Sequence, residues 1–246
     1  MAFLCRIQHE GQGKIPAMHT ILAIETSSEL ASAALMHKGA VIARETVGVQ
    51  THSQTLLPMV QALLSEAGLT LTQCDAIAFG AGPGSFTGVR TACGVAQGLA
   101  FGANLPVVPV VTLQAMADAC RQKCGADEVL VLLDARMEEI YWAQYRYRDG
   151  WETISEPALS PPSMIPQSPE MVACGNGLTA YASVFAEWPL MKNALPDIVP
   201  HAEQVVRLAH AEVVAGRLIN ARDAQPIYLR NKVALTTQER QARAAA

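Results

Sequence analysis

A glycine-rich turn at 81–88, Ala-Gly-Pro-Gly-Ser-Phe-Thr-Gly, is the stretch best suited to chemistry. The pattern predicts a strand over 75–80 before it and a helix over 87–103 after it. A helix N-terminus presents unpaired N–H groups and the positive end of the helix dipole, which suit an anion or a phosphate. The candidate phosphate-binding residues in this unit are Gly82, Gly84, Ser85 and Arg90.

This turn matches neither of two well-known phosphate loops. A Walker loop ends in Gly-Lys-Ser/Thr, whereas Gly88 is followed here by Val89 and Arg90. A dinucleotide fingerprint needs an acidic residue at the end of the next strand, where this chain has Thr112. A tight turn that serves packing is therefore the favoured interpretation, and phosphate binding is the alternative. Arg90 either extends to the surface or binds a carboxylate or a phosphate.

Polar residues also stand at the ends of two apolar strands. Glu25, Thr26 and Ser27 follow the first of these strands, and Asp134 follows a later one. The two turns could face one another across a cleft and hold phosphate hydroxyls or a metal. Ordinary turn chemistry explains the same residues at least as well. Thr26, Ser27 and Asp134 therefore join the candidate nucleotide-binding residues.

Signatures of metal binding and nucleophilic catalysis are missing from the sequence. The histidines stand at 9, 19, 37, 52, 201 and 210, so no helix offers two of them three or four residues apart. The six cysteines include no Cys-x-x-Cys pair, and the Cys120–Cys124 pair has no histidine near it. The chain also lacks a Gly-x-Ser-x-Gly elbow. We predict no metal site and no catalysis by this chain alone.

The helix after the glycine-rich turn carries a stripe of glycines. Gly94, Gly98 and Gly102 share one helix face, and each costs about 1 kcal/mol relative to alanine in a helix interior. Something must pack very close to this face to offset that loss. A neighbouring element of the same chain and a helix of a second subunit are equally consistent with the pattern.

The composition indicates a globular protein that works in a reducing compartment. Half of the 246 residues are hydrophobic, and the net charge of -4 gives no general attraction to nucleic acid. Residues 91–113 carry no charge, but Gln97, Asn104, Pro106 and Pro109 interrupt the apolar run, so a membrane span is rejected. We interpret residues 1–17 as a leader outside the fold and expect a cytoplasmic protein without a membrane anchor.

The remaining elements form two similar series. Three strands are expected between 20 and 47, then an amphipathic helix over 51–68 with Thr51 or Ser53 as its cap and Pro58 in its first turn or at a kink. The three strands and the two strands that flank the glycine helix are expected to form a mixed sheet of about five strands. A second series has strands over 128–136, 139–148 and 151–154, a loop over 155–170, a short strand over 171–177 and a helix over 201–215. We therefore predict that the two series fold into two lobes of the same architecture.

Four segments of this chain resemble the TsaB (YeaZ) family of bacterial tRNA threonylcarbamoyladenosine biosynthesis proteins. They are Ile-Glu-Thr-Ser at 24–27, Gly-Pro-Gly-Ser-Phe-Thr-Gly-Val-Arg at 82–90, Leu-Asp-Ala-Arg at 133–136 with Glu-Ile-Tyr at 139–141, and Pro-Ile-Tyr-Leu-Arg at 226–230. The resemblance implies an α/β, actin/hexokinase/Hsp70-like (ASKHA, ribonuclease H-like) fold of two related lobes. We assign the lobes to 18–112 and 113–230, with a return to the first lobe near the end and a polar tail over 231–246.

The resemblance also implies a function. The chain would be a non-catalytic scaffold that dimerises with TsaD, the transferase that modifies the adenosine next to the anticodon of tRNAs reading ANN codons. It would support binding of the ATPase TsaE, have no cofactor of its own, and meet tRNA and ATP or ADP only within the complex. TsaD-like chains carry two metal-binding histidines four residues apart, which this sequence lacks. The alternatives are an ATP-dependent kinase or metallopeptidase-like enzyme of this fold, and an adenine-nucleotide-binding regulator.

The subunit contact implied by the resemblance uses the helices over 52–67 and 87–103. The same surface would pair two copies of this chain when TsaD is missing. The implied interface residues are His52, Leu56, Met59, Val60, Leu63, Thr91, Gly94, Val95, Gly98, Leu99 and Gly102.

Overall fold

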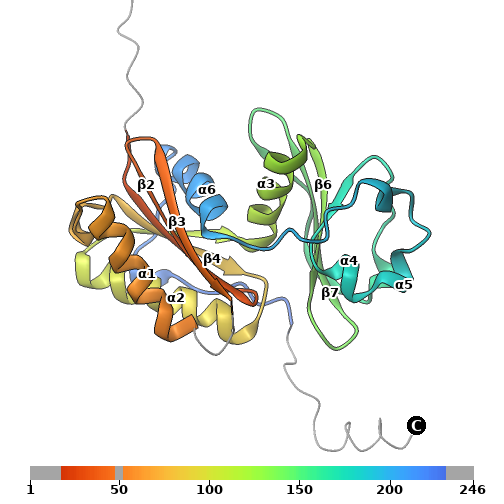
Figure 1. Cartoon of the computed structure of the whole chain (residues 1–246), viewed down its shortest axis with the longest axis horizontal. Coiled ribbons are helices and arrows are strands. Elements are labelled where there is room, and N and C mark those ends of the chain that lie inside the picture. The colour runs from red at the N-terminus through yellow and green to blue at the C-terminus, as the bar shows by residue number, and fades with distance from the viewer. Residues whose placement is uncertain (1–17, 48–51, 231–246) are drawn as a thin grey trace, which may run out of the picture.

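The computed structural model describes residues 18–47 and 52–230. Two lobes, each built on a sheet, lie beside one another (Figure 1). The leader, the cap at Thr51 and the polar tail predicted from the sequence fall outside the described residues.

The first sheet has the strand order β3-β2-β1-β4-β5. Its strands are β1 (Ile21–Glu25), β2 (Leu30–His37), β3 (Ala40–Val47), β4 (Ala76–Gly82) and β5 (Val107–Val111). β1, β2 and β3 pair antiparallel as a meander, and β4 adds to β1 in parallel, with Ile21 opposite Ala76. The predicted three strands and parallel crossover are confirmed.

Helices cover both faces of this sheet. α1 (His52–Glu66) and α2 (Phe86–Ala103) lie on one face, and α6 (Ala202–Val214) lies on the other (Figure 1). Because side chains alternate along a strand, Leu22 and Ile24 pack toward α1 and α2 while Ile21 and Ala23 pack toward α6. β1 is therefore apolar on both sides, as its uninterrupted run of buried residues requires.

The second sheet repeats the order of the first, β8-β7-β6-β9. Its strands are β6 (Glu128–Asp134), β7 (Ile140–Tyr147), β8 (Trp151–Ser160) and β9 (Val172–Cys174). Again three strands form a meander and a fourth adds in parallel, which confirms the prediction of one architecture used twice. α3 (Thr112–Cys124) packs on the face toward the first lobe, and α4 (Gly177–Ala180) and α5 (Ala182–Phe185) cover the other (Figure 1).

Short 3-10 helices complete the described elements. They are η2 (Leu71–Gln73), η3 (Pro162–Met164), η4 (Pro189–Asn193) and η5 (Ala221–Asp223). None of the helices within 18–47 and 52–230 is both long and apolar enough to cross a membrane.

The structure corrects the loop predicted over 155–170 and shows where the expected return to the first lobe takes place. β8 runs to Ser160, although the prolines after 154 predicted a loop. Pro157 falls where the register with β7 shifts, on a strand at the sheet edge, so its missing N–H removes no ladder bond. The chain also leaves this lobe earlier than the predicted boundary at 230. From Ala202 it packs on the first sheet, and Ile219 bridges to Val107 of β5.

The start of α1 differs from the prediction as well. Ser53 lies inside the helix, which begins at His52, so Ser53 is not its cap. Pro58 lies beyond the first turn, on the exposed side of the helix. The carbonyl of Gln54, whose usual helical donor Pro58 lacks, is on that exposed side too and can accept a bond from water.

Candidate functional site

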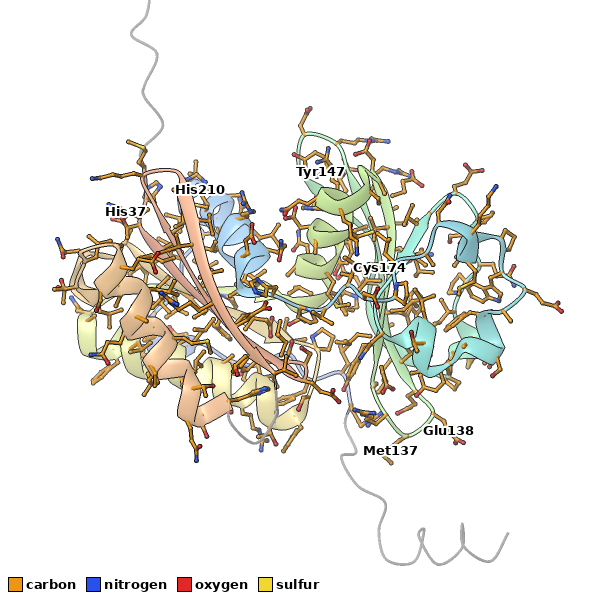
Figure 2. The ribbon with its side chains drawn as sticks, viewed as in Figure 1. His37, Met137, Glu138, Tyr147, Cys174 and His210 are labelled. Carbon is orange, nitrogen blue, oxygen red and sulfur yellow. The ribbon has the colours of Figure 1, made fainter. Side chains whose placement is uncertain are left out.

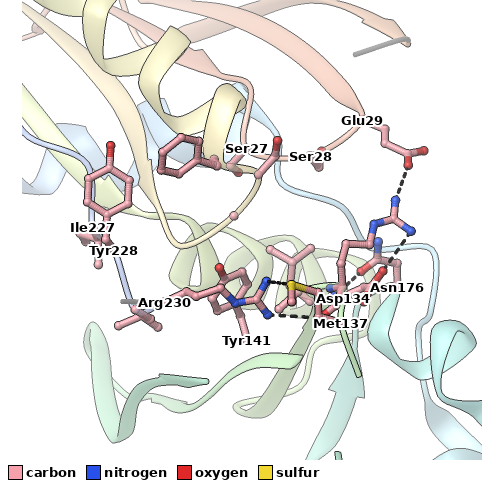
Figure 3. A pocket seen from close by; sticks show the side chains of 17 residues that line it. Ser27, Ser28, Glu29, Asp134, Met137, Tyr141, Asn176, Ile227, Tyr228 and Arg230 are labelled. Atoms are coloured by element: carbon pink, nitrogen blue, oxygen red, sulfur yellow. Dashed lines mark hydrogen bonds and ion pairs between the residues drawn. The ribbon is translucent and has the colours of Figure 1, made fainter. Parts of the chain in front are cut away.

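A cleft of about 360 Å³ lies between the two lobes (Figure 3). Its walls come from the turn after β1, the glycine-rich turn before α2, the turn after β6 and the chain segment 227–230. Ser27 and Ser28 face Asp134 and Tyr141 across it (Figure 3). The two polar turns predicted to oppose one another are thus brought together.

Four of the seven candidate nucleotide-binding residues line this cleft, and they are Ser27, Gly84, Ser85 and Asp134. The other three have different roles. The Thr26 hydroxyl is buried and donates to the Gly88 carbonyl at 2.7 Å, and the Gly82 N–H donates to the Thr112 hydroxyl at 3.1 Å. Arg90 is exposed, and its guanidinium stacks on the Phe86 ring at 3.6 Å.

The glycine-rich turn is held against the turn after β1 by close backbone packing. The Ser85 N–H donates to the Ser27 carbonyl at 2.7 Å. A Cβ on Gly84 would lie 2.6 Å from the Ser27 carbonyl oxygen, and one on Gly88 would overlap the Thr26 carbonyl. The Ser85 side chain also accepts the Gly88 N–H and caps α2. These contacts explain the glycines through packing, as the sequence favoured.

Glu25 lies behind the cleft and does not line it. Its side chain is fully buried, where one carboxylate oxygen accepts the Ser27 N–H at 2.6 Å and the other accepts the Thr112 hydroxyl at 3.3 Å. A Cβ on Gly80 would overlap this carboxylate, so the strand needs a glycine there. Burial raises the pKa of Glu25, and the hydrogen bonds from Ser27 and Thr112 oppose that rise. Glu25 therefore supports the turn after β1.

The turn after β6 contains three consecutive left-handed residues. Arg136, Met137 and Glu138 have φ values of 61°, 57° and 62°, a conformation that costs roughly 1–2 kcal/mol for each non-glycine residue. Asp134 offsets part of this strain because its carboxylate accepts the Arg136 N–H at 2.8 Å. The Tyr181 hydroxyl donates to the same carboxylate at 3.1 Å. Burial, followed by the Asp134 charge, raises the pKa of Tyr181 to about 12.

A C-terminal strap, which we define as residues 226–230, joins the lobes along the cleft. Ile227 donates its N–H to the Ala81 carbonyl of the first lobe at 2.7 Å. Arg230 forms an ion pair with Glu139 of the second lobe at 2.5 Å and donates to the Arg136 carbonyl at 3.2 Å. Figure 3 shows Arg230 reaching toward Met137. The sequence singled out this segment only through the family resemblance, and its links could not be predicted because neither of its partners is near it in the chain.

A second link crosses the mouth of the cleft. Arg136 pairs with Glu29 of the first lobe at 2.9 Å and with Asp134 of its own lobe at 3.3 Å. Both Arg136 and Glu29 are largely exposed, so this pair contributes little stability. It does place a basic side chain over the polar turns.

The subunit interface predicted from the sequence is partly corrected by burial. On α1, five predicted interface residues are buried in the core of the first lobe and cannot contact a partner, and they are His52, Leu56, Met59, Val60 and Leu63. An apolar stripe marks the buried face of a helix whether a sheet or a subunit covers it, so periodicity could not separate the two. Leu57, on the outer face of α1, is 49% exposed instead.

The predicted glycines of α2 lie on its outer surface, whereas Val95 and Leu99 are half-buried and pack against the core of the first lobe. Gly94, Gly98 and Gly102 are exposed, and a Cβ on any of them would meet no atom within 4 Å. Phe101 lies on the same helix face and is 83% exposed. We call this surface the glycine face and define it by Thr91, Gly94, Val95, Gly98, Leu99, Phe101 and Gly102. The sequence left open whether an element of the same chain or a helix of a second subunit packs on the glycines. Within residues 18–47 and 52–230, no element covers them.

Known proteins share this arrangement. A family model described as TsaD, tRNA N6-adenosine threonylcarbamoyltransferase, matches residues 38–184. The chain is 40% identical to the tRNA threonylcarbamoyladenosine biosynthesis protein TsaB of Escherichia coli, covering 87% of this chain and 96% of that protein. It is 41% identical to the protein of the same description from Haemophilus influenzae, covering 87% and 94%.

A solved structure from Pseudomonas aeruginosa, described as an uncharacterized protein with similarity to peptidase YEAZ, superimposes with a TM-score of 0.81 at 40% identity. The match covers 87% of this chain and 100% of that one. Two lobes with the same strand order and a polar cleft between them define an ASKHA-like α/β protein. Within that class, the chain belongs to the TsaB (YeaZ) family.

Proposed function

We propose that this protein is a non-catalytic subunit in the biosynthesis of threonylcarbamoyladenosine in tRNA, and that it binds the transferase TsaD through its glycine face. The E. coli and H. influenzae relatives carry names from this pathway. The observation that carries the proposal is the open space over Gly94, Gly98 and Gly102. Three helical glycines in one row weaken an isolated helix and become favourable when a second helix packs against their backbone.

Exposed apolar side chains support a helix as the occupant of this face. Phe101 and Leu57 are large, apolar and well exposed on α2 and α1. A partner helix would remove both from water and would fill the space beside the glycines. The gain from burying two such side chains is on the order of 3–5 kcal/mol. We infer that the same face pairs two copies of this chain when TsaD is absent.

The contacts in the cleft support a scaffold role over catalysis. Glu25 is enclosed and holds the turn after β1, while Asp134 holds the strained turn after β6. The glycine-rich turn rests directly on Ser27, in the place where a phosphate would meet the turn. Most of the polar groups that the sequence suggested for ligand binding, such as those of Thr26, Ser85 and Asp134, therefore support the walls of the cleft, while the Ser27 hydroxyl has no hydrogen-bond partner among the described residues.

TsaE would join the complex of this chain with TsaD, and tRNA would be held by the complex in the cytoplasm. ATP or ADP would act at the level of the complex, without a cofactor that belongs to this chain.

A nucleotide-binding regulator is the second candidate, and the cleft favours it. The volume of about 360 Å³ accommodates a small ligand, and the side chains of Ser27 and Arg230 line it. Equilibrium dialysis with labelled ADP tests this candidate directly. Binding that Ser27→Phe abolishes, with no effect of Gly98→Leu, would support the regulator and locate the ligand in the cleft.

Multi-angle light scattering tests the scaffold. The chain is measured alone, mixed with its cognate TsaD, and again as Gly98→Leu. We expect a homodimer alone, a heterodimer with TsaD, and loss of both in the variant, because the leucine side chain occupies the space that the partner backbone needs. Gly150→Leu is the matched control, because a Cβ on Gly150 also meets no atom within 4 Å but lies far from α2. If the chain stays monomeric and does not bind TsaD, the proposed scaffold function is wrong.

A further inference from the structure

Three cysteine thiols meet on the inner side of the second lobe, outside the residues that line the cleft. Cys120 and Cys124 stand one turn apart on α3, with their Sγ atoms 4.0 Å apart. Cys174 on β9 packs in the same core cluster as Cys120, and its thiol donates to the Met116 carbonyl of α3 at 3.9 Å. Figure 2 shows Cys174 between α3 and the second sheet. Cys120 and Cys174 are buried, whereas Cys124 is exposed.

The three sulfurs differ in their electronic state. The neighbouring Cys174 thiol lowers the pKa of Cys120, and Cys124 and Lys123 add to that effect against the opposing influence of burial. Burial raises the pKa of Cys174, and burial together with the neighbouring Cys120 also raises the pKa of Cys124. An exposed sulfur therefore lies next to a buried one that has enhanced thiolate character. The roles of the two sulfurs follow from geometry: a hydroperoxide in solvent can reach Cys124 first, and the Cys120 sulfur, 4.0 Å away, is placed to resolve the product.

We propose that Cys124 and Cys120 form a dithiol oxidation site that reacts with a hydroperoxide and closes to a disulfide. In the first step the Cys124 sulfur attacks the peroxide, an S–O bond forms, the O–O bond breaks, and water leaves after proton transfer. In the second step the Cys120 thiolate attacks the Cys124 sulfur, the S–S bond forms, the S–O bond breaks, and the hydroxide takes up a proton. Two thiols and one hydrogen peroxide give one disulfide and two waters.

The backbone permits this closure with a local change. Helix geometry places Cα atoms four residues apart at about 6 Å, inside the range that disulfides span. The two Sγ atoms must approach from 4.0 Å to about 2 Å. Cys124 is the last residue of α3, and Gly125 follows it in a left-handed conformation with φ 75°. Only the final turn must adjust, with loss of the bond from the Cys124 thiol to the Cys120 carbonyl.

Two further cysteines serve as internal controls. Burial raises the pKa of Cys74 to about 11 and also raises that of Cys93. Both thiols are buried in the core of the first lobe. They should stay reduced under conditions that oxidise the α3 pair.

The experiment treats the full chain, in a Cys5→Ser background, with hydrogen peroxide and follows intact mass and tryptic peptides. Trypsin releases Cys124 on peptide 124–136 and Cys120 on peptide 91–121, so a disulfide appears as two linked peptides, and fragmentation distinguishes Cys120 from Cys93 on the longer one. We expect the loss of two hydrogens and that linked pair. Cys120→Ser should instead stop at a Cys124 sulfenic acid that dimedone traps. Cys174→Ala should slow closure, because Cys174 is the main neighbour that lowers the pKa of Cys120.

Three results would overturn the site. They are the absence of the linked pair in the chain that retains both thiols, equal oxidation of Cys74 and Cys93, and the same two-hydrogen loss in Cys120→Ser. The first two need no variant of the α3 cysteines, so they decide the proposal even if a substitution impairs folding.

Discussion

Glu25 illustrates how a buried ionisable residue can serve structure in a cleft that looks built for chemistry. Its carboxylate connects the Ser27 backbone to the Thr112 side chain, and Gly80 leaves room for it. The sequence placed Glu25 correctly at the end of a buried strand, since an apolar run followed by polar residues is a local pattern. It could not show whether the side chain faces the cleft, because that depends on Thr112, which lies 87 residues away.

A pH titration of stability tests this role. Burial raises the pKa of Glu25 above its ordinary 4.5, so above pH 4.5 the folded state holds this proton more firmly than the unfolded state. Stability therefore falls as pH rises from 4.5 through the folded-state pKa, by at most about 1.4 kcal/mol per pH unit for a single group. Glu25→Gln keeps an oxygen for the Ser27 N–H and should remove this contribution, which makes the variant relatively more stable at neutral pH.

Denaturant unfolding at several pH values measures the effect. Glu170→Gln, a change at an exposed position, is the control and should follow the parent chain. Burial also raises the pKa of Asp118, so some pH dependence remains in every variant. If the free energy of unfolding changes with pH equally in Glu25→Gln and in the parent chain, then Glu25 has the same pKa in the folded and the unfolded state.

The C-terminal strap is an element that stabilises both lobes without regular secondary structure. Ile227 packs against the core of the first lobe and Leu229 against that of the second. Arg230, whose side chain is only 15% exposed, holds Glu139 and the strained turn after β6. The strap thus couples the geometry of the two lobes.

Arg230→Met should weaken this coupling. The methionine keeps part of the apolar stem but loses the ion pair with Glu139 and the bond to the Arg136 carbonyl, at a cost of about 1–2 kcal/mol of folding stability. Hydrogen exchange should quicken over residues 135–139, because their left-handed turn loses its clamp. Arg217→Met is the control, since that arginine pairs with Glu212 within one surface region. Unchanged exchange over 135–139 would mean that Asp134 and Tyr181 hold the turn alone.

Local pattern predicted most of the elements, and long-range packing decided the rest. The strands of both meanders and the glycine helix follow from alternation, glycines and caps in short windows of sequence. The extension of β8 through Pro157 depends on its edge position, and the return of α6 to the first sheet depends on which face was left uncovered. The family resemblance places the apolar stripe of α1 in a subunit contact, and the sequence pattern cannot correct this, because it does not distinguish a sheet of the same chain from another subunit.

At the scale of the whole molecule, the charges beside the glycine face favour an unlike partner over a second copy. Arg90 stands in the same row as Gly94 and Gly98, and no carboxylate pairs with it among residues 18–47 and 52–230. Phe86 stacks on its guanidinium and the Tyr228 hydroxyl accepts from its Nε at 2.7 Å, so the side chain is already oriented. α2 contains no acidic residue, so two copies paired along α2 would leave both arginines without a carboxylate.

If the proposed scaffold is correct, a partner helix that offers a carboxylate to Arg90 binds more tightly than a second copy does. Arg90→Gln should then weaken the complex with TsaD by about tenfold or more, as loss of a charge-assisted hydrogen bond predicts. The homodimer should change much less, because it gains nothing from this charge. Both dissociation constants are measurable by analytical ultracentrifugation. Arg222→Gln, at an arginine that pairs with Asp223, is the control. Equal weakening of both assemblies would show that Arg90 acts through packing at the start of α2, and the preference for an unlike partner would then need another source.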